Sequence, residues 1–277
     1  MSLKISHNAG FFSCCSVKLN KITDYINEKK QLPEHVDSSE QFELYKINKT
    51  DDITFDYFEH YNNKDIEYPI QDKPIDYWYG HQFIDYNKLE YTSLCPLVNK
   101  YFSPSTNIKN KIEEIKQKYN LDYNNICVLF YRGNDKATEI KLCGYDEYIN
   151  NAKLIIKRNP EIQFLIQSDE TQFIETMLQE FPTNSFYFKD ETRNMKKYSD
   201  QHGSVDYMMA TQNNLFSKYF LAITIIMSQC KYVVCISGNC SLWIILYRGN
   251  CKGVYQYLSQ NVTIKEITEN KWIVNEN

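Results

Sequence analysis

The chain has 277 residues, of which 43% are hydrophobic and 24% charged, so it can bury a substantial core as one large domain or two smaller ones. Its 8 glycines and 7 prolines exclude collagen-like and low-complexity proteins. A formal net charge of −4 argues against a general binder of nucleic acid or of anionic membranes, and we expect no nucleic-acid partner.

The first 120 residues predict an irregular α/β region. A strand beginning near Leu3 runs into the loop HNAGFF, and a helix follows over 13–29 with Ser13 as its N-cap. Residues 50–85 are polar, aromatic and acidic without clear periodicity. Two further helices are predicted, over 88–101 and 108–119.

From residue 125 onward, short apolar runs alternate with helical patterns. The predicted strands are 126–131, 163–168, 185–188, 231–236 and 253–257, and the predicted helices are 145–158, 170–181 and 206–229. This alternation predicts a mostly parallel sheet covered on both faces, which binds its ligand outside the carboxyl ends of the strands. We therefore predict an α/β fold with an N-terminal α/β domain over 1–120 and a Rossmann-like domain over 121–277.

The nine cysteines indicate a reducing compartment. Their number is odd, no CxxC occurs, and several lie inside apolar runs such as ICVLF and YVVCI. The N-terminus lacks the apolar segment of a signal peptide, and no stretch approaches the roughly 18 apolar residues that a membrane span needs. We expect a cytoplasmic protein without a membrane span.

Three loops leave the carboxyl ends of predicted strands, where ligand groups should gather. The first, FYRGNDKATE, places a cation that can clamp phosphate, Arg132, near a carboxylate that can act as a base, Glu139. Asp135 and Lys136 lie between them. Composition alone fits a solvated charged turn at least as well.

The other two loops carry weaker signals. In QSDE, Ser168 or Asp169 can cap the next helix, or a carboxylate can hold a base edge or ribose hydroxyls. In CISGNCSLW, small residues before a helix leave backbone N–H groups for an anion, and the hydroxyls of Ser237 and Ser241 can add to them.

The order and spacing of these loops resemble the fucosyltransferase superfamily that includes core α1,6-fucosyltransferases, nodulation fucosyltransferases and protein O-fucosyltransferases. The family motif HxRRxDKxxTE corresponds to FYRGNDKATE, the acidic pair after the next strand to SDE, and the small-residue loop before a helix to CISGNCSLW. The resemblance covers about 125–250. Toward the N-terminus it is faint, with HNAGFF as the counterpart of the family's Gly-Asn loop.

The resemblance implies a role for each matching residue. Arg132 matches the arginine that contacts the donor diphosphate, and Glu139 matches the proposed catalytic base, with Asp169 as the alternative base. The donor-binding residues implied by the resemblance are Arg132, Asp135, Lys136, Asp169, Glu170, Ser237, Gly238, Asn239 and Ser241. Two positions depart from the motif, because Phe130 replaces the family histidine and Gly133 the second arginine.

The resemblance further implies a GT-B-like fold, with two Rossmann-like domains facing a cleft and the nucleotide donor held mainly by the C-terminal one. It implies inverting transfer of L-fucose from GDP-fucose to a glycan hydroxyl, without a metal or another cofactor. The chain agrees in containing no DxD motif. Charge develops on the departing diphosphate, so fixed donors there favour the transition state.

Weaker candidates lie in loops. His7 and His202 could reach the cleft, and Trp78 with Tyr77, Tyr79 and His81 could stack an acceptor sugar, although packing explains aromatic residues as well. Three alternatives stay open. They are a transferase of the same fold using another nucleotide sugar, a non-catalytic nucleotide- or glycan-binding module, and a metal-dependent nuclease built on Asp135 and the run Glu139–Lys141. Short spacing between the acids and the acidic chain disfavour the nuclease.

Overall fold

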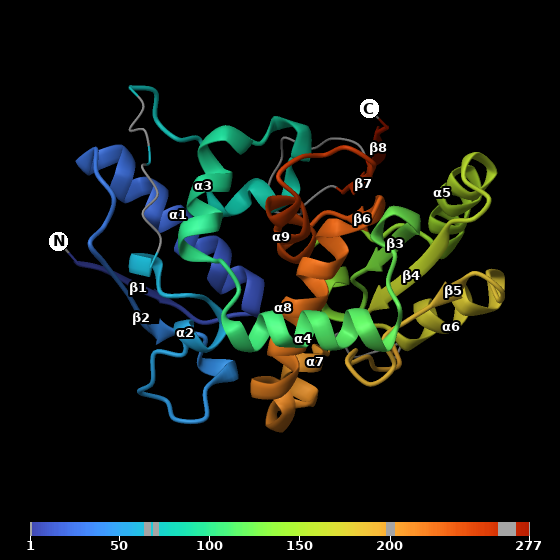
Figure 1. Cartoon of the computed structure of the whole chain (residues 1–277), viewed down its shortest axis with the longest axis horizontal. Coiled ribbons are helices and arrows are strands. Elements are labelled where there is room, and N and C mark those ends of the chain that lie inside the picture. Colours follow the sequence, from blue (N-terminus) through green and yellow to red (C-terminus); the bar gives the residue numbers. More distant parts are fainter. Residues whose placement is uncertain (1, 64–67, 69–71, 198–202, 260–269, 277) are drawn as a thin grey trace.

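The structure is a computed structural model that describes residues 2–63, 68, 72–197, 203–259 and 270–276. Figure 1 shows the N-terminal elements on one side, the C-terminal sheet on the other, and helix α8 between them. The N-terminal helices and strands are β1 (Ser2–His7), α1 (Phe11–Lys29), β2 (His35–Gln41), α2 (Thr54–Tyr57), α3 (Tyr91–Tyr101) and α4 (Thr106–Lys118).

The C-terminal half confirms the predicted alternation of strands and helices. Its elements are β3 (Ile126–Tyr131), α5 (Tyr145–Arg158), β4 (Gln163–Ser168), α6 (Thr171–Glu180), β5 (Ser185–Phe186), α7 (Val205–Met208), α8 (Asn213–Gln229), β6 (Tyr232–Ile236), α9 (Asn239–Arg248), β7 (Val254–Leu258) and β8 (Lys271–Asn275). The strand order is β5-β4-β3-β6-β7-β8. All neighbouring pairs are parallel except β7 and β8.

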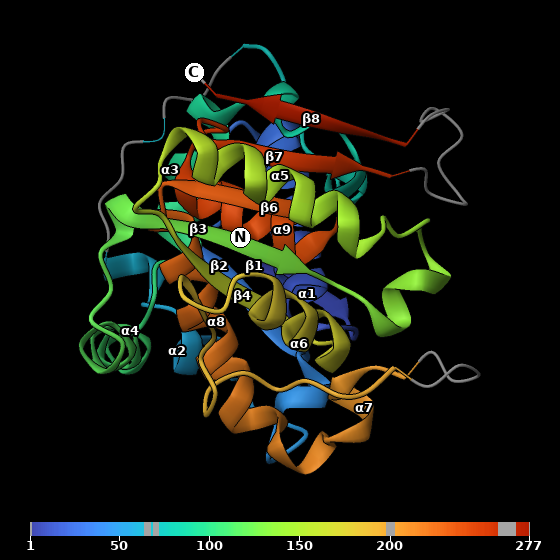
Figure 2. The same ribbon diagram turned by 90° about the vertical axis from the view of Figure 1, so that its right-hand side faces the viewer.

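Both faces of the sheet are covered, as the apolar strands predict. Side chains alternate along a strand, so Val128 and Phe130 of β3 pack into a core cluster with α1, α8 and α9, whereas Cys127 and Leu129 pack into a second cluster with α5 and α6. Figure 2 shows α5 and α6 in front of the strands. Burial on both faces is why β3 consists of apolar and aromatic residues throughout.

The strand order creates a switch point between β3 and β6. From β3 the chain crosses to β4 and β5 on one side, and later returns to β6 and β7 on the other. The loops after β3 and β6 therefore diverge, and a crevice opens between them at the carboxyl ends of the strands. This is where the predicted donor-binding loops meet.

The N-terminal region shares its core with the sheet. Within the described residues it has a parallel sheet of two strands, β1 and β2. Leu19 of α1 and Leu97 of α3 belong to the same cluster as Ile226 of α8 and Trp243 of α9. The division into two Rossmann-like domains at residue 120 stays a prediction.

Several predicted elements differ from the observed ones. The helix predicted over 206–229 is broken, because residues 209–212 interrupt it and the buried Asn213 side chain bonds the carbonyls of Leu44 and Asp206 at the start of α8. The strand predicted over 185–188 keeps only its first two residues. Strand β2, with the sequence HVDSSEQ, has no apolar alternation and was not predicted.

Two predicted helix caps are wrong. Helix α1 begins at Phe11 with Gly10 as its N-cap, so Ser13 lies in the first turn. Glu170, rather than Ser168 or Asp169, is the N-cap residue of α6, and it makes no side-chain capping bond. The Ser168 hydroxyl accepts a hydrogen bond from the Glu170 backbone N–H, a turn that precedes the helix.

Candidate functional site

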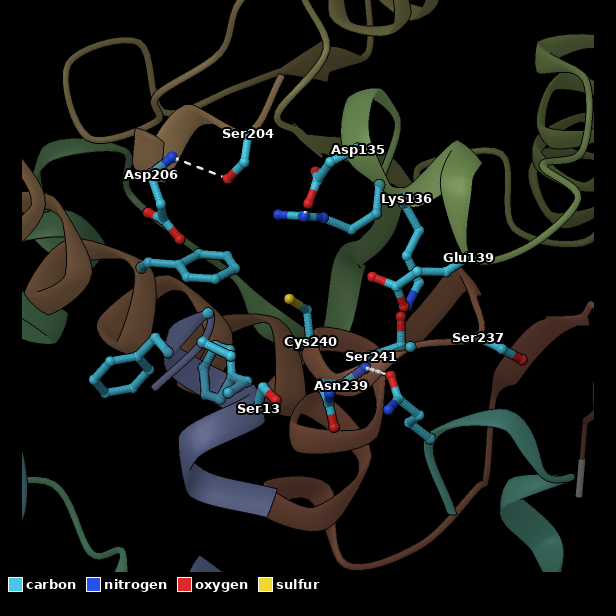
Figure 3. Close-up of a pocket in the computed structure, with 18 of the residues that line it drawn as sticks. Ser13, Asp135, Lys136, Glu139, Ser204, Asp206, Ser237, Asn239, Cys240 and Ser241 are labelled. Atoms are coloured by element: carbon cyan, nitrogen blue, oxygen red, sulfur yellow. Dashed lines mark hydrogen bonds and ion pairs between the residues drawn. The ribbon is translucent and has the colours of Figure 1, made fainter. Parts of the chain in front are cut away.

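A cavity of about 340 Å³ lies at the carboxyl ends of β3 and β6. The sheet supplies two of its segments, 132–139 after β3 and 236–241 after β6. The N-terminal region supplies residues 7–13, together with Tyr79 and Gln82, and residues 204–207 precede or begin α7. Figure 3 shows side chains from these segments around the cavity. The sequence-predicted loops after β3 and β6 thus come together.

Arg132 is fixed at the centre of this arrangement by two carboxylates. Its Nη2 donates to Asp135 Oδ1 at 3.0 Å, and its Nε lies 3.5 Å from Asp169 Oδ2. The side chain is 20% exposed. Burial lowers the pKa of Arg132, but Asp169 and then Asp135 raise it, with a net increase above the ordinary value. A permanently charged guanidinium with a set orientation lines the cavity.

The acidic pair supports the arginine loop from behind. Asp169 Oδ1 accepts a hydrogen bond of 2.9 Å from the Gly133 N–H. Glu170 is fully buried, accepts from the Asn134 N–H at 3.3 Å, and bonds the Tyr145 hydroxyl. Burial raises the pKa of Glu170. Neither carboxylate lines the large cavity, so the pair acts on the loop and not on a ligand there.

The glycine at position 133 has a physical explanation. A Cβ at Gly133 would overlap Glu170 Oε2, so any larger side chain requires the buried carboxylate to move. An arginine in this position, as in the family motif, is incompatible with the present packing of Glu170. The glycine that departs from the motif therefore leaves the space in which Glu170 packs and supports the loop.

Lys136 and Glu139 form an ion pair on the cavity wall. Their Nζ and Oε2 atoms are 2.6 Å apart, and the Lys136 side chain is 8% exposed whereas that of Glu139 is 47% exposed. The ammonium lies 4.9 Å from the centre of the Phe83 ring, and a Cβ at Gly238 would be 3.1 Å from Lys136 Cε. Gly238 thus leaves room for Lys136 beside the start of α9. Burial is also the largest influence on Asp135, whose pKa it raises.

The loop after β6 differs from its prediction. The hydroxyls of Ser237 and Ser241 donate to the carbonyls of Tyr257 and Ile236, so their hydrogens are not directed to a ligand. The backbone N–H of Gly238 donates to the Tyr86 hydroxyl at 3.2 Å, and that of Asn239 to Gln82 Oε1 at 3.2 Å. The N-terminal region therefore occupies N–H groups that the sequence predicted to be free for an anion.

The Asn239 side chain also contributes to packing. Its Oδ1 accepts from the Ser16 hydroxyl at 2.7 Å, and that hydroxyl accepts from Trp243 Nε1 at 2.9 Å. Helix α1 is thereby fastened to the start of α9. In Figure 3 the sulfur of the neighbouring Cys240 points toward the open centre of the cavity.

Sequence reasoning missed Asp206 and the segment around it. Asp206 Oδ2 accepts from the Tyr45 hydroxyl at 2.7 Å, and its Oδ1 accepts from Arg193 Nη2 at 2.8 Å. The Tyr45 hydroxyl in turn accepts from the Phe11 N–H at 2.6 Å. This network ties the first residue of α1 to α7. No motif marks Asp206, because its partners are distant in sequence.

The weaker candidates fall in different places. His7 lines the cavity, its Nε2 lies 3.0 Å from the Ser13 hydroxyl, and burial lowers its pKa. Tyr77 and His81 are buried, Trp78 is exposed outside the cavity, and Tyr79 lines it. His202 lies outside the described residues.

A smaller cavity of about 50 Å³ adjoins the first, sharing Arg132, Asp206 and Phe220 with it. Phe130 and Phe216 give it apolar walls, and its polar lining includes Gln167, Asp169 and Arg193. Asp169 therefore lies behind Arg132 at the smaller cavity.

No group of three His, Cys, Asp or Glu side chains among the described residues could hold a metal ion. Within the same residues, no helix combines the length and apolar character needed to cross a membrane. All nine cysteines are unpaired.

No protein-family model matches the chain, and no curated protein sequence matches it. Solved structures do match. A NodZ α-1,6-fucosyltransferase soaked with GDP-fucose shares 10% identity over 99% of both chains, with a TM-score of 0.55. The same enzyme co-crystallised with GDP shares 10% identity over 100% of this chain and 99% of that one, with a TM-score of 0.54.

The chain has a fucosyltransferase-like fold. A third structure, selenomethionine fucosyltransferase NodZ from Bradyrhizobium, agrees at 11% identity over 99% and 98% of the two chains, with a TM-score of 0.51. The likeness extends over the N-terminal region, where the sequence resemblance was faint. The family predicted from the loop motifs is therefore confirmed at the level of fold.

Proposed function

We propose that this protein is a metal-independent, inverting glycosyltransferase that transfers L-fucose from GDP-fucose to a glycan hydroxyl. One observation carries the proposal. Arg132 is a fixed cation at the switch point of a Rossmann-like sheet, in a chain that shares its fold with NodZ structures prepared with GDP-fucose and GDP. Residues 121–277 would hold the donor and residues 1–120 would face the acceptor.

The diphosphate would lie against Arg132 and Lys136. When the bond between the sugar and the diphosphate breaks, the electron pair leaves with the diphosphate and negative charge grows on its oxygens. The Arg132 guanidinium is already oriented by Asp135 and Asp169, so it stabilises this charge without reorganising. Lys136 is held near the Gly238 backbone and adds a second positive charge.

Glu139 is the base that the geometry favours. The acceptor oxygen attacks the sugar carbon opposite the departing diphosphate, and its proton passes to the carboxylate. The Glu139 side chain lines the large cavity and is about half exposed, so a hydroxyl can reach it. Both carboxylates face a cation, Glu139 facing Lys136 and Asp169 facing Arg132. Asp169 is the poorer base, because it does not line the large cavity and its Oδ1 accepts from the Gly133 N–H.

Two alternatives remain within the proposal. The first is another nucleotide sugar as donor. The aromatic walls of the smaller cavity suit a flat nucleobase, but Phe130 stands where the family has a histidine and its side chain offers no hydrogen bond. Donors with other nucleobases should therefore be tested as well. A non-catalytic module that binds the nucleotide or a glycan is the second.

Nine unpaired cysteines support a cytoplasmic location.

The deciding experiment is a calorimetric titration of the purified protein with GDP and with UDP in the presence of EDTA. Selective GDP binding supports the proposal, and preference for UDP retains the transferase but changes the donor. Binding of neither nucleotide contradicts a transferase that uses a GDP- or UDP-sugar and favours the non-catalytic module. Glu139→Gln should then retain GDP affinity and lose glycosyl transfer. Loss of transfer together with GDP affinity would argue against a role as the base.

A further inference from the structure

Gln82 is a buried amide side chain that lines the large cavity. It lies in the 3₁₀ helix Tyr79–Phe83 of the N-terminal region and is only 2% exposed. Its Oε1 accepts from the Asn239 N–H at 3.2 Å, a bond that Figure 3 marks with a dashed line. Because an N–H group faces the amide oxygen, the orientation of the amide is set, and its NH₂ group forms the other branch.

The NH₂ group of Gln82 is not used inside the protein. The Gln82 backbone carbonyl accepts from the Tyr86 hydroxyl and its Oε1 accepts from Asn239, but its Nε2 has no hydrogen-bond partner within the part of the chain that the structure describes. A buried amide N–H without an acceptor costs free energy, so we expect an acceptor in the cavity to satisfy it. Gln82 therefore presents a hydrogen-bond donor to a ligand there.

Tyr86, which contacts the same loop, has no such spare group. Its hydroxyl accepts from the Gly238 N–H at 3.2 Å and lies 3.2 Å from the carbonyl oxygens of both Gly238 and Gln82. Tyr86 is fully buried and is not among the residues that line the cavity. Tyr86 thus only holds the loop, whereas Gln82 holds the loop and keeps a donor for a ligand.

The groups beside Gln82 favour an anion. A Cβ at Gly238 would be 3.3 Å from Lys136 Nζ, and the next residue, Asn239, is the one that Gln82 contacts. Lys136 also pairs with Glu139, but an ammonium has three donors. With its Oε1 already bonded, Gln82 can only donate, as can Lys136. Two neighbouring groups that only donate suit the oxygens of an oxyanion, which only accept.

We propose that Gln82 binds the diphosphate of the donor, with its Nε2 donating to a phosphate oxygen while its Oε1 keeps the hydrogen bond from Asn239. The proposal rests on the proposed function, which supplies the diphosphate, and it gives the N-terminal region a part in donor binding. The N–H group at the start of α9 polarises the amide and so strengthens donation from Nε2. This backbone N–H then acts on the anion through Gln82.

The experiment titrates the full chain with GDP and with inorganic pyrophosphate in a calorimeter. Gln82→Met keeps the length of the side chain without the donor or the acceptor, and should weaken both ligands by about 10- to 100-fold, as loss of a hydrogen bond to a charged group does. Gln82→Glu keeps an acceptor for Asn239 but replaces the donor with a negative charge, so it should weaken both ligands further. A purely structural role would rank the two variants the other way, since only glutamate keeps the bond to α9.

Asn20→Ala is the matched control. Asn20 Oδ1 accepts from the Tyr79 N–H at 3.2 Å and so holds the same 3₁₀ helix, but Asn20 does not line the cavity, and its replacement should leave GDP affinity unchanged.

Unchanged affinity in both Gln82 variants, or a greater loss in Gln82→Met than in Gln82→Glu, would overturn the role of Gln82 and leave the proposed function in place. Pyrophosphate binding that depends on Gln82, without GDP binding, would support the contact with the anion and contradict the proposed donor. Binding of neither ligand to the unaltered protein would overturn both.

Discussion

The large cavity has two walls built in different ways. The strand-end wall, formed by residues 132–139 and 236–241, follows two neighbouring parallel strands, and the sheet alone brings its charges together. The N-terminal wall, formed by residues 7–13 and 79–82, consists of a helix start and a 3₁₀ turn. Charge is concentrated on the first wall, and exposed aromatic surface and small polar groups on the second. The proposed chemistry divides in much the same way, with the acceptor on the second wall and the donor on the first, apart from its proposed contact with Gln82.

The first prediction tests whether the strand-end wall carries donor binding. Arg132→Ala should abolish GDP binding and slow glycosyl transfer by about 100- to 1000-fold, because it removes a fixed donor to the departing charge, worth about 2.7–4 kcal/mol. Calorimetry and single-turnover rates measure the two effects. Arg158→Ala is the control, since that side chain is 52% exposed and pairs with Glu276. Full GDP affinity in Arg132→Ala would mean that the strand-end wall does not bind the donor through this residue.

The second prediction concerns a buried charge behind the N-terminal wall. Lys18 of α1 is fully buried, its Nζ has no hydrogen-bond partner among the described residues, and burial lowers its pKa from 10.5 to about 8. At about 1.4 kcal/mol per pKa unit, this costs the folded state about 3 kcal/mol at neutral pH. Lys18→Met should raise the free energy of unfolding by a similar amount.

The pH dependence of Lys18→Met provides its own control. The folded pKa lies below the unfolded one, so the penalty is present below about pH 8 and disappears as the pH rises through the unfolded value of 10.5. The gain in the variant should shrink over that range in denaturant titrations at several pH values. A gain independent of pH would mean that folding does not change the pKa of Lys18.

A third prediction compares one glycine from each wall. Gly133→Ala should destabilise the protein by about 1–3 kcal/mol, because its Cβ overlaps the buried Glu170 carboxylate. Gly10→Ala should leave the free energy of unfolding nearly unchanged, since no atom lies within 4 Å of the added Cβ and φ at Gly10 is −54°. Thermal unfolding measures both. If both substitutions changed the free energy of unfolding equally, the strand-end wall at Gly133 would not be more tightly packed than the N-terminal wall at Gly10.

The smallest effect is expected where the N-terminal wall meets α7. Tyr45→Phe removes the hydroxyl that joins the Phe11 N–H to Asp206, and should cost about 1–2 kcal/mol of stability. Tyr207→Phe is the control for stability, because that side chain is 70% exposed. If the network also positions the wall, Tyr45→Phe should raise the KM for the acceptor with little change in GDP affinity. An unchanged KM would limit the network to stability.

The comparison explains which predictions succeeded. Strands 126–131 and 163–168 and helix 145–158 were predicted with the bounds that the structure has, because fully buried strands and a two-faced helix leave strong apolar patterns. Strand β2 and the break in the predicted helix before Asn213 left no such apolar pattern. A strand of polar residues and a buried asparagine depend on partners far away in the chain.

The sequence by itself determined the parallel strands of the sheet, the grouping of Arg132, Lys136 and Glu139 at one strand end, and the resemblance of these loops to fucosyltransferases, since all of these are local patterns. Only the tertiary structure decided that Asp169 and Glu170 support the arginine loop from behind. It also decided that the N-terminal region occupies N–H groups of Gly238 and Asn239, and that Asp206 and Tyr79 line the cavity. Hydrogen bonding and burial between distant segments assign these roles, and neither can be read from the spacing of residues along the chain.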